Sequence, residues 1–140
     1  MAASGLARFL AAQDNGVFEM ALAELRAGEK RSHWMWFVFP QIAGLGRSDL
    51  ARFYTIESPS EARDYLDHPV LGARLLTCTD AMLTWAGRRS AETILGAIDA
   101  IKFRSSMTLF DTVSAGRAPF GAALTAFYGG QRDPETLRRL

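Results

Sequence analysis

The feature that most constrains the fold of this chain is a row of apolar residues spaced alternately four and three positions apart. Side chains with this spacing lie on one side of an α-helix, so the row predicts a long helix with a buried stripe. His68-Pro69 is expected to open this helix, and Gly87 is expected to end it. The row consists of Leu71, Leu75, Cys78, Met82 and Trp85.

Four shorter rows with helical spacing occur elsewhere in the chain. Gly28 follows the second row and Gly129-Gly130 follows the fourth, and glycine is common directly after a helix. Together the rows predict amphipathic helices that pack on a core. The rows are Leu6, Phe9 and Leu10; Phe18, Leu22 and Leu25; Phe103, Met107, Phe110 and Val113; and Phe120, Leu124 and Phe127.

Capping residues predict where several of the helices begin. Ser58-Pro59-Ser60-Glu61 combines a capping serine, a proline at the first helical position and a glutamate three residues after the serine. Asp133-Pro134 is expected to open a short C-terminal helix, and Ser90 is expected to cap a helix over residues 91–98. His68, directly before a proline, is interpreted as a cap and not as a ligand.

The segment Trp34–Phe39 is a continuous apolar run, which fits either a buried strand or a buried helix. No neighbouring segment alternates convincingly, and a lone strand would leave its backbone without partners. We therefore expect a short buried helix that ends near Pro40, followed by a loop over residues 41–52. The chain is thus predicted to be a single all-α domain over residues 1–140, with about seven to nine helices.

The composition is that of a soluble globular domain, with 49% apolar and 22% charged residues. A formal net charge of +1 argues against nonspecific nucleic-acid binding, which depends on a basic excess. No apolar run approaches the ~20 residues that span a bilayer, and the polar segment Met1–Gly5 does not open a secretory signal. The single cysteine excludes an internal disulfide, so we expect a protein of the reducing cytoplasm.

Several chemistries are excluded by residues that the chain lacks. A structural zinc site needs about four Cys or His ligands, and the chain has one cysteine and two histidines, widely spaced. Gly44-Leu45-Gly46 lacks the preceding strand and the further glycine of a dinucleotide-binding loop. Cys78 lies on the apolar stripe of its helix, where a thiol is usually buried and unreactive. We therefore expect neither a metal nor a cofactor.

Two segments place charged and polar residues directly beside apolar ones, and they contain both lysines of the chain. A lysine near two hydroxyls suits a phosphate or carboxylate group, and a tryptophan can stack on a nucleotide ring. We therefore interpret residues 30–41 and 102–106 as the lining of one pocket for an anionic small molecule, nucleotide-like or phosphorylated. The expected ligand-binding residues are Lys30, Ser32, His33, Trp34, Trp36, Gln41, Lys102, Ser105 and Ser106.

These residues also have structural interpretations. His33 can begin a helix with its ring hydrogen-bonded, or it can act as a ligand contact or general base. Lys102 can extend along the apolar surface to solvent, and the two tryptophans can belong to the core. The aromatic segment can instead form an exposed groove for a partner helix. A protein-interaction module and a purely structural domain are therefore the alternatives, and the sequence names no reaction and no oligomeric state.

Three long blocks of the sequence carry a family resemblance. They are residues 30–41 with Gly44-Leu45-Gly46, residues 65–75, and Asp99 with residues 102–110. These blocks resemble a bacterial and fungal domain family of unknown function, some of whose members carry the label calpastatin. The resemblance covers nearly the whole chain and ends with residues 127–130 and 133–137.

The resemblance implies a compact, mainly α-helical domain, in agreement with the helical spacing, and it implies no established activity. The family usually has an aromatic residue where this chain has Leu95, before Gly96, and this difference indicates altered packing in the core. The calpastatin label has no physical basis here. Calpain inhibitors are largely disordered, whereas this chain has the apolar content of a packed core.

Overall fold

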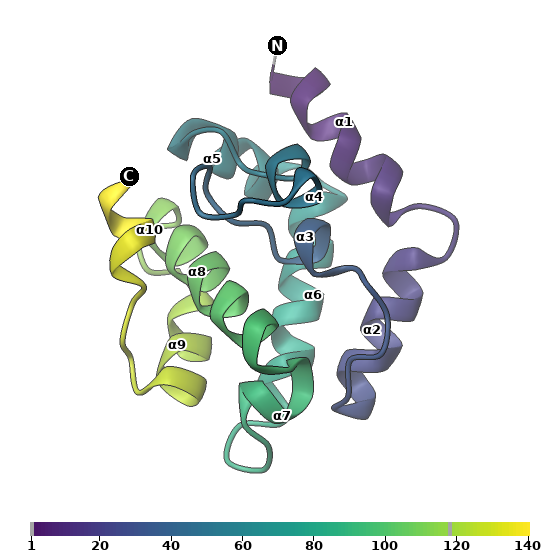
Figure 1. Cartoon of the computed structure of the whole chain (residues 1–140), viewed down its shortest axis with the longest axis vertical. Helices are drawn as coiled ribbons and strands as arrows, with labels where there is room; N and C mark the ends of the chain where they lie inside the picture. Colours follow the sequence, from purple (N-terminus) through teal and green to yellow (C-terminus); the bar gives the residue numbers. More distant parts are fainter. Residues whose placement is uncertain (1, 118) are drawn as a thin grey trace.

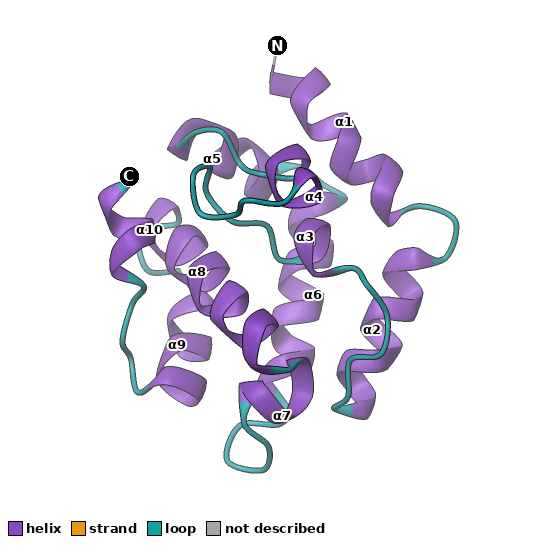
Figure 2. Ribbon diagram, in the orientation of Figure 1, coloured by secondary structure: helices purple, strands orange, loops and turns teal. Residues whose placement is uncertain are grey.

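The structure, a computed structural model, describes residues 2–117 and 119–140, with side-chain surroundings from residue 5 onward. Met1 and Ala118 lie outside this range. Met1 is the first residue of the Met1–Gly5 segment, which is not expected to open a secretory signal. Within the described residues the chain forms ten helices joined by loops, and it forms no strand (Figures 1 and 2). The helices are α1 (Ala2–Gln13), α2 (Val17–Ala27), α3 (Met35–Val38), α4 (Asp49–Phe53), α5 (Pro59–Asp67), α6 (Leu71–Leu83), α7 (Ala91–Leu95), α8 (Ala97–Val113), α9 (Phe120–Tyr128) and α10 (Pro134–Arg138).

The predicted all-α fold is confirmed, and α6 lies at its centre. This helix contacts α2, α3, α5 and α9. Four residues of the predicted stripe are buried, namely Leu71, Leu75, Cys78 and Met82. The fifth, Trp85, lies beyond the end of α6, since the helix stops at Leu83 and not at Gly87. Trp85 is half-buried, and its indole N–H donates to the carbonyl of Leu25 at 2.8 Å, so it joins α2 to this end of α6.

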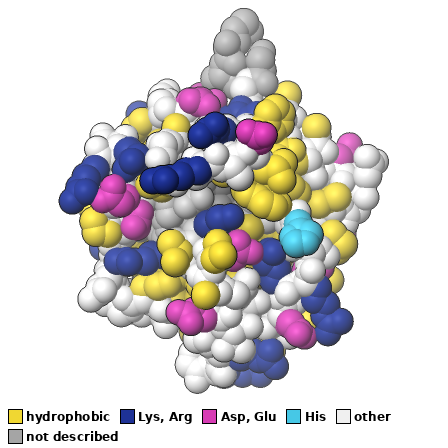
Figure 3. Space-filling view, in the orientation of Figure 1, with side chains coloured by type: hydrophobic (Ala, Val, Ile, Leu, Met, Phe, Trp, Pro, Cys, Tyr) yellow, Lys and Arg dark blue, Asp and Glu magenta, His cyan; other side chains and the backbone are white. Residues whose placement is uncertain are grey.

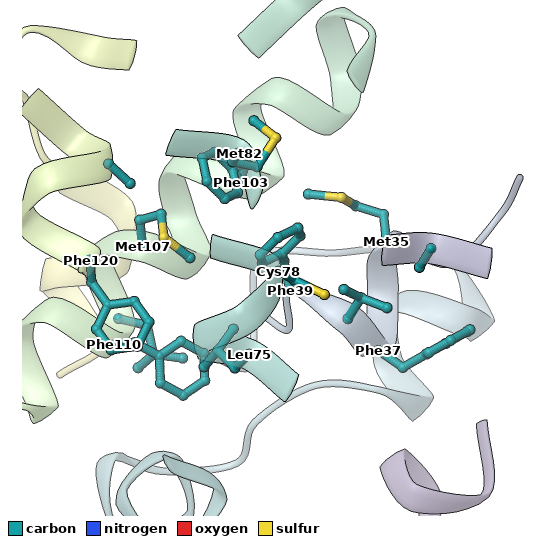
Figure 4. Packing of buried hydrophobic residues seen from close by; sticks show 14 of the residues in the cluster. Met35, Phe37, Phe39, Leu75, Cys78, Met82, Phe103, Met107, Phe110 and Phe120 are labelled. Atoms are coloured by element: carbon teal, nitrogen blue, oxygen red, sulfur yellow. The ribbon is translucent and has the colours of Figure 1, made fainter. Parts of the chain in front are cut away.

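The 17-residue helix α8 is the second organising element, and it contacts α5, α7, α9 and α10. Its predicted row is buried at Phe103, Met107 and Phe110. The rings of Phe39 and Phe103 meet edge to face with 4.8 Å between their centres. Apolar side chains from α3, α6, α8 and α9 therefore form one core (Figure 4).

The predicted helix starts at three caps are confirmed. The Ser58 hydroxyl accepts the N–H of Glu61 at 3.1 Å, and the Asp133 carboxylate accepts the N–H of Thr136 at 3.0 Å. Nδ1 of His68 accepts the N–H groups of Val70 and Leu71, which makes this histidine a cap of α6. Each cap satisfies N–H groups that the first turn of a helix leaves without partners.

Two further predicted boundaries are wrong. The helix expected over residues 91–98 ends at Leu95, because Gly96 has a φ of 91° and separates α7 from α8. The loop expected over residues 41–52 contains α4, whose N-cap is Ser48. This short helix was missed because none of its residues is buried, so it has no apolar stripe to reveal it. With α4 the described residues hold one helix more than the upper end of the expected range.

The segment that precedes α4 is held by backbone pairing. Ile42 and Ile56 form an isolated parallel bridge, in which the N–H of Ile56 donates to Gln41 and the N–H of Ala43 donates to Ile56, both at 2.8 Å. No helix in the described part of the chain is long and apolar enough to cross a membrane.

Candidate functional site

The shape of the segment before α3 depends on one carboxylate of α2. Oε1 of Glu24 accepts the N–H groups of Arg31 and Ser32 at 2.7 and 2.9 Å and the indole N–H of Trp34 at 2.9 Å. Oε2 accepts the Ser32 hydroxyl at 2.6 Å. Burial acts to raise the pKa of the Glu24 carboxyl, but these hydrogen bonds outweigh it and lower the pKa to about 2. Glu24 therefore holds this segment as an acceptor that is charged near neutral pH.

Two predicted ligand residues are consequently used by the fold itself. Ser32 points its hydroxyl at Glu24, and Trp34 is completely buried with its indole N–H on the same carboxylate. The ring of Trp34 is therefore not accessible to a ligand. The signal that would have revealed Glu24 is weak in the sequence, because a glutamate in an amphipathic helix is usually solvated.

The two lysines of the chain meet at a single carboxylate, that of Asp99 in the first turn of α8. Nζ of Lys30 lies 2.9 Å from Asp99 Oδ2, and Nζ of Lys102 lies 3.7 Å from Asp99 Oδ1. The ammonium of Lys30 also lies over the ring of Trp34 at 5.2 Å, and that of Lys102 lies over the ring of Trp36 at 5.1 Å. Tertiary packing thus joins the two segments that the sequence singled out.

This cluster carries a formal charge of +1, since two ammonium groups share one carboxylate. The side chains of Lys30, Asp99 and Lys102 are only 10%, 18% and 22% exposed, so water screens them incompletely. Lys30, Asp99 and the exposed His33 line a hollow of about 430 Å³, whose floor is formed by residues 95–98. In Figure 3 the middle of this face, over α8, shows acidic and basic side chains next to apolar ones.

Two buried polar atoms, one on α3 and one on α8, have no hydrogen-bond partner in the protein. They are Nε1 of Trp36 and Oγ of Ser106, and no other buried side-chain nitrogen or oxygen in the described residues lacks one. The Lys102 ammonium lies over the Trp36 ring. Ser106 follows Lys102 by four residues, on the next turn of α8, and its side chain is completely buried. An unpaired buried polar group costs about 1–3 kcal/mol. Both residues belong to the predicted ligand set.

The remaining predicted residues have other partners. The hydroxyls of Ser105 and Thr136 bond to each other at 2.8 Å, which docks α10 on α8. The carbonyl of Gln41 accepts the N–H of Ile56 in the parallel bridge. The structure therefore brings Lys30, His33, Trp36 and Lys102 together around Asp99, with Ser106 buried on the next turn of α8. It uses the side chains of Ser32, Trp34 and Ser105, and the backbone of Gln41, in local structure.

The other reactive groups lie in the core. Burial raises the pKa of the Cys78 thiol to about 12, so this cysteine stays protonated near neutral pH. Burial also raises the pKa of Tyr65 and of Tyr128, whose hydroxyls bond to the carbonyls of Phe37 and Ala100. The expectation that Cys78 is buried is confirmed.

Comparison with known proteins gives one family and one solved structure. The model of the family described as "Protein of unknown function (DUF1810)" matches residues 3–140. The crystal structure of the conserved hypothetical protein Rv1873 from Mycobacterium tuberculosis is similar, with a TM-score of 0.90 and 48% sequence identity. That match covers 96% of this chain and 95% of the other. No curated protein matches the chain.

Proposed function

This chain belongs to the DUF1810 family of proteins of unknown function, and we propose that it binds a small anionic molecule at Lys102. The observation that carries the proposal is a lysine cluster with a charge of +1 whose Lys102 ammonium lies over the ring of Trp36, a residue with a buried, partnerless Nε1. We call Lys30, Trp36, Asp99, Lys102 and Ser106 the Lys102 site.

The chemistry of the Lys102 site favours an oxyanion. A phosphate or carboxylate oxygen can accept hydrogen bonds from an ammonium, an indole N–H and a hydroxyl at the same time. The Lys102 and Trp36 side chains are each partly exposed, so such a group can approach them from solvent. The Ser106 hydroxyl is completely buried and becomes reachable only if the side chains around it move. Trp36 is also the one tryptophan of the predicted pair that keeps an accessible ring, which supports a nucleotide-like or phosphorylated ligand.

The arrangement of Asp99 makes Lys102 the residue to change. Lys30 lies nearer to this carboxylate than Lys102 does, at 2.9 Å compared with 3.7 Å. Removal of the Lys102 charge therefore leaves Asp99 with a close partner, whereas removal of the Lys30 charge does not. A variant at Lys102 separates ligand binding from folding better than a variant at Lys30.

The test uses Lys102→Met, which keeps most of the aliphatic stem and removes the charge. Nucleotides, sugar phosphates and small dicarboxylates are screened by thermal shift, because a ligand at 100 times its Kd stabilises the folded state by about 2.7 kcal/mol. Calorimetry of the best ligand should show binding weakened by about 1.5–3 kcal/mol in the variant. The free energy of unfolding of Lys102→Met without ligand should differ little from that of the unmodified protein.

Arg31→Met is the matched control. Arg31 is an exposed cation next to Lys30 in the sequence, and it pairs with Glu29 and not with Asp99. Its affinity for the ligand should equal that of the unmodified protein. A loss of about 3 kcal/mol or more in the stability of Lys102→Met without ligand would assign Lys102 to the fold. Equal affinities of the Lys102 and Arg31 variants would likewise contradict the proposal.

A further inference from the structure

The helix α8 exposes an apolar ridge that no other element covers. Ile98 and Ile101 are 71% and 68% exposed, more than any other large apolar side chain in the described residues. They are three positions apart in the helix, so they lie side by side on its outer face. Further along α8 the same face is covered by α10, where Ser105 meets Thr136. The helix α8 itself crosses the front of the molecule in Figure 1.

The two sides of this ridge carry opposite charge. On one side lie Lys30, Asp99 and Lys102, with a formal charge of +1. On the other side lies a hollow of about 510 Å³ lined by Ile101, Glu92, Arg104 and Asp133, whose charged groups sum to −1. The helical period agrees with this division of charge. At about 100° per residue, Asp99 and Lys102 project from one side of the line through Ile98 and Ile101, and Arg104 projects from the other side.

We propose that the ridge is the contact surface of a two-fold symmetric dimer in which the α8 helices of two copies lie parallel. A two-fold axis parallel to α8 places the lysine side of each copy opposite the acidic side of the other. It also places Ile98 against Ile98 and Ile101 against Ile101 of the second copy.

An axis perpendicular to α8 would give antiparallel helices and would bring the two lysine clusters together. Repulsion between like charges disfavours that arrangement. The charges beside the ridge therefore favour a second copy of this chain as the partner, with its α8 helix parallel to that of the first. The inference goes beyond the proposed anion binding and does not depend on it.

The first test measures mass without any ligand. Light scattering coupled to gel filtration, from about 10 µM to about 1 mM, should show the mass rise from 15.4 kDa toward twice that value. Ile101→Glu places two carboxylates at the axis and should remain monomeric throughout. Leu50→Glu is the matched control, since Leu50 is 49% exposed on α4, and it should dimerise like the unmodified protein.

The second test asks whether the Ile98–Ile101 ridge itself lies at the two-fold axis. With a parallel pair, Ile101→Cys brings two identical thiols together at the axis, and copper–phenanthroline should oxidise them to a disulfide-linked dimer. Leu50→Cys should give at least tenfold less linked dimer, and the buried Cys78 should not react. A monomer at every concentration, a dimer that survives Ile101→Glu, or Ile101→Cys linking no better than Leu50→Cys would each overturn the proposal.

Discussion

Glu24 shows how a single side chain can determine the shape of the segment that follows its helix. Its carboxylate accepts hydrogen bonds from two backbone N–H groups, one hydroxyl and one indole, all within Arg31–Trp34. Hydrogen bonds to a charged acceptor contribute about 1.5–3 kcal/mol each in favourable cases. The lysine cluster depends on this residue indirectly, because Lys30 adjoins the segment that Glu24 holds.

The low pKa of Glu24 predicts a specific dependence of stability on pH. Its pKa falls from 4.5 to about 2 on folding, so its contribution is complete above about pH 4.5 and is lost as the pH falls toward 2. The shift corresponds to at most about 3 kcal/mol, and partial exposure reduces this to about 1–2 kcal/mol. Glu24→Gln should lose about this much at pH 7 and show a smaller further loss at pH 3.

Chemical denaturation at the two pH values measures both effects. Glu19→Gln is the control, because Glu19 is an exposed residue of the same helix. It should behave like the unmodified protein at both pH values. If Glu24→Gln lost as much stability between pH 7 and pH 3 as the unmodified protein, another group would be responsible for the acid dependence.

At the scale of elements, the corner between α5 and α6 leaves no room for a side chain at residue 72. His68 caps α6 through Nδ1, and the N–H of Gly72 donates to the carbonyl of His68 at 2.9 Å. A β-carbon at Gly72 would lie 2.0 Å from the carbonyl oxygen of Leu66, which is backbone and has little freedom to move. The two helices approach this closely only because residue 72 has no side chain.

We therefore expect Gly72→Ala to destabilise the protein, although alanine is normally the better residue inside a helix. The overlap with Leu66 should cost about 1–3 kcal/mol or more, as in other overpacked sites. Ala73→Gly, at the adjacent exposed position, should cost only about 1 kcal/mol. Urea unfolding of both variants measures the difference, and a Gly72→Ala protein as stable as the original would show that the corner can relax.

At the scale of the whole molecule, stability rests on the core that α6 and α8 share with the shorter helices. Rings from Phe39, Tyr65, Phe103, Phe110 and Phe120 form edge-to-face or tilted contacts through this core. Leu75 of α6 is among its largest completely buried side chains. A void at this position would have aromatic and aliphatic neighbours on every side and little means to close.

Leu75→Ala should accordingly lower the free energy of unfolding by about 2–5 kcal/mol. Leu76→Ala, its immediate neighbour, is the control, because Leu76 is partly exposed and lines only a surface hollow. The control should lose about 1 kcal/mol or less. Similar losses in the two variants, measured by chemical denaturation, would place Leu75 outside the core.

Much of the fold could be predicted because helical spacing and caps are local properties. The row through Leu71, Leu75, Cys78 and Met82 determines which face of α6 is buried, and Ser58, His68 and Asp133 determine where helices begin. The elements that escaped prediction lack such local signals. α4 buries no residue, and the break at Gly96 interrupts a pattern that otherwise continues.

The candidate site was predictable only in part, because its partnerships span the chain. Helical spacing was enough to predict an all-α chain, and the two lysines marked the two segments of mixed polarity. The packing of the helices then joined Lys30 and Lys102 at Asp99, placed Trp34 and Ser105 in local structure, and left Trp36 and Ser106 with unpaired polar atoms. The physical reason is that spacing along a helix dictates which face is buried, whereas the packing of distant helices dictates which polar groups meet there.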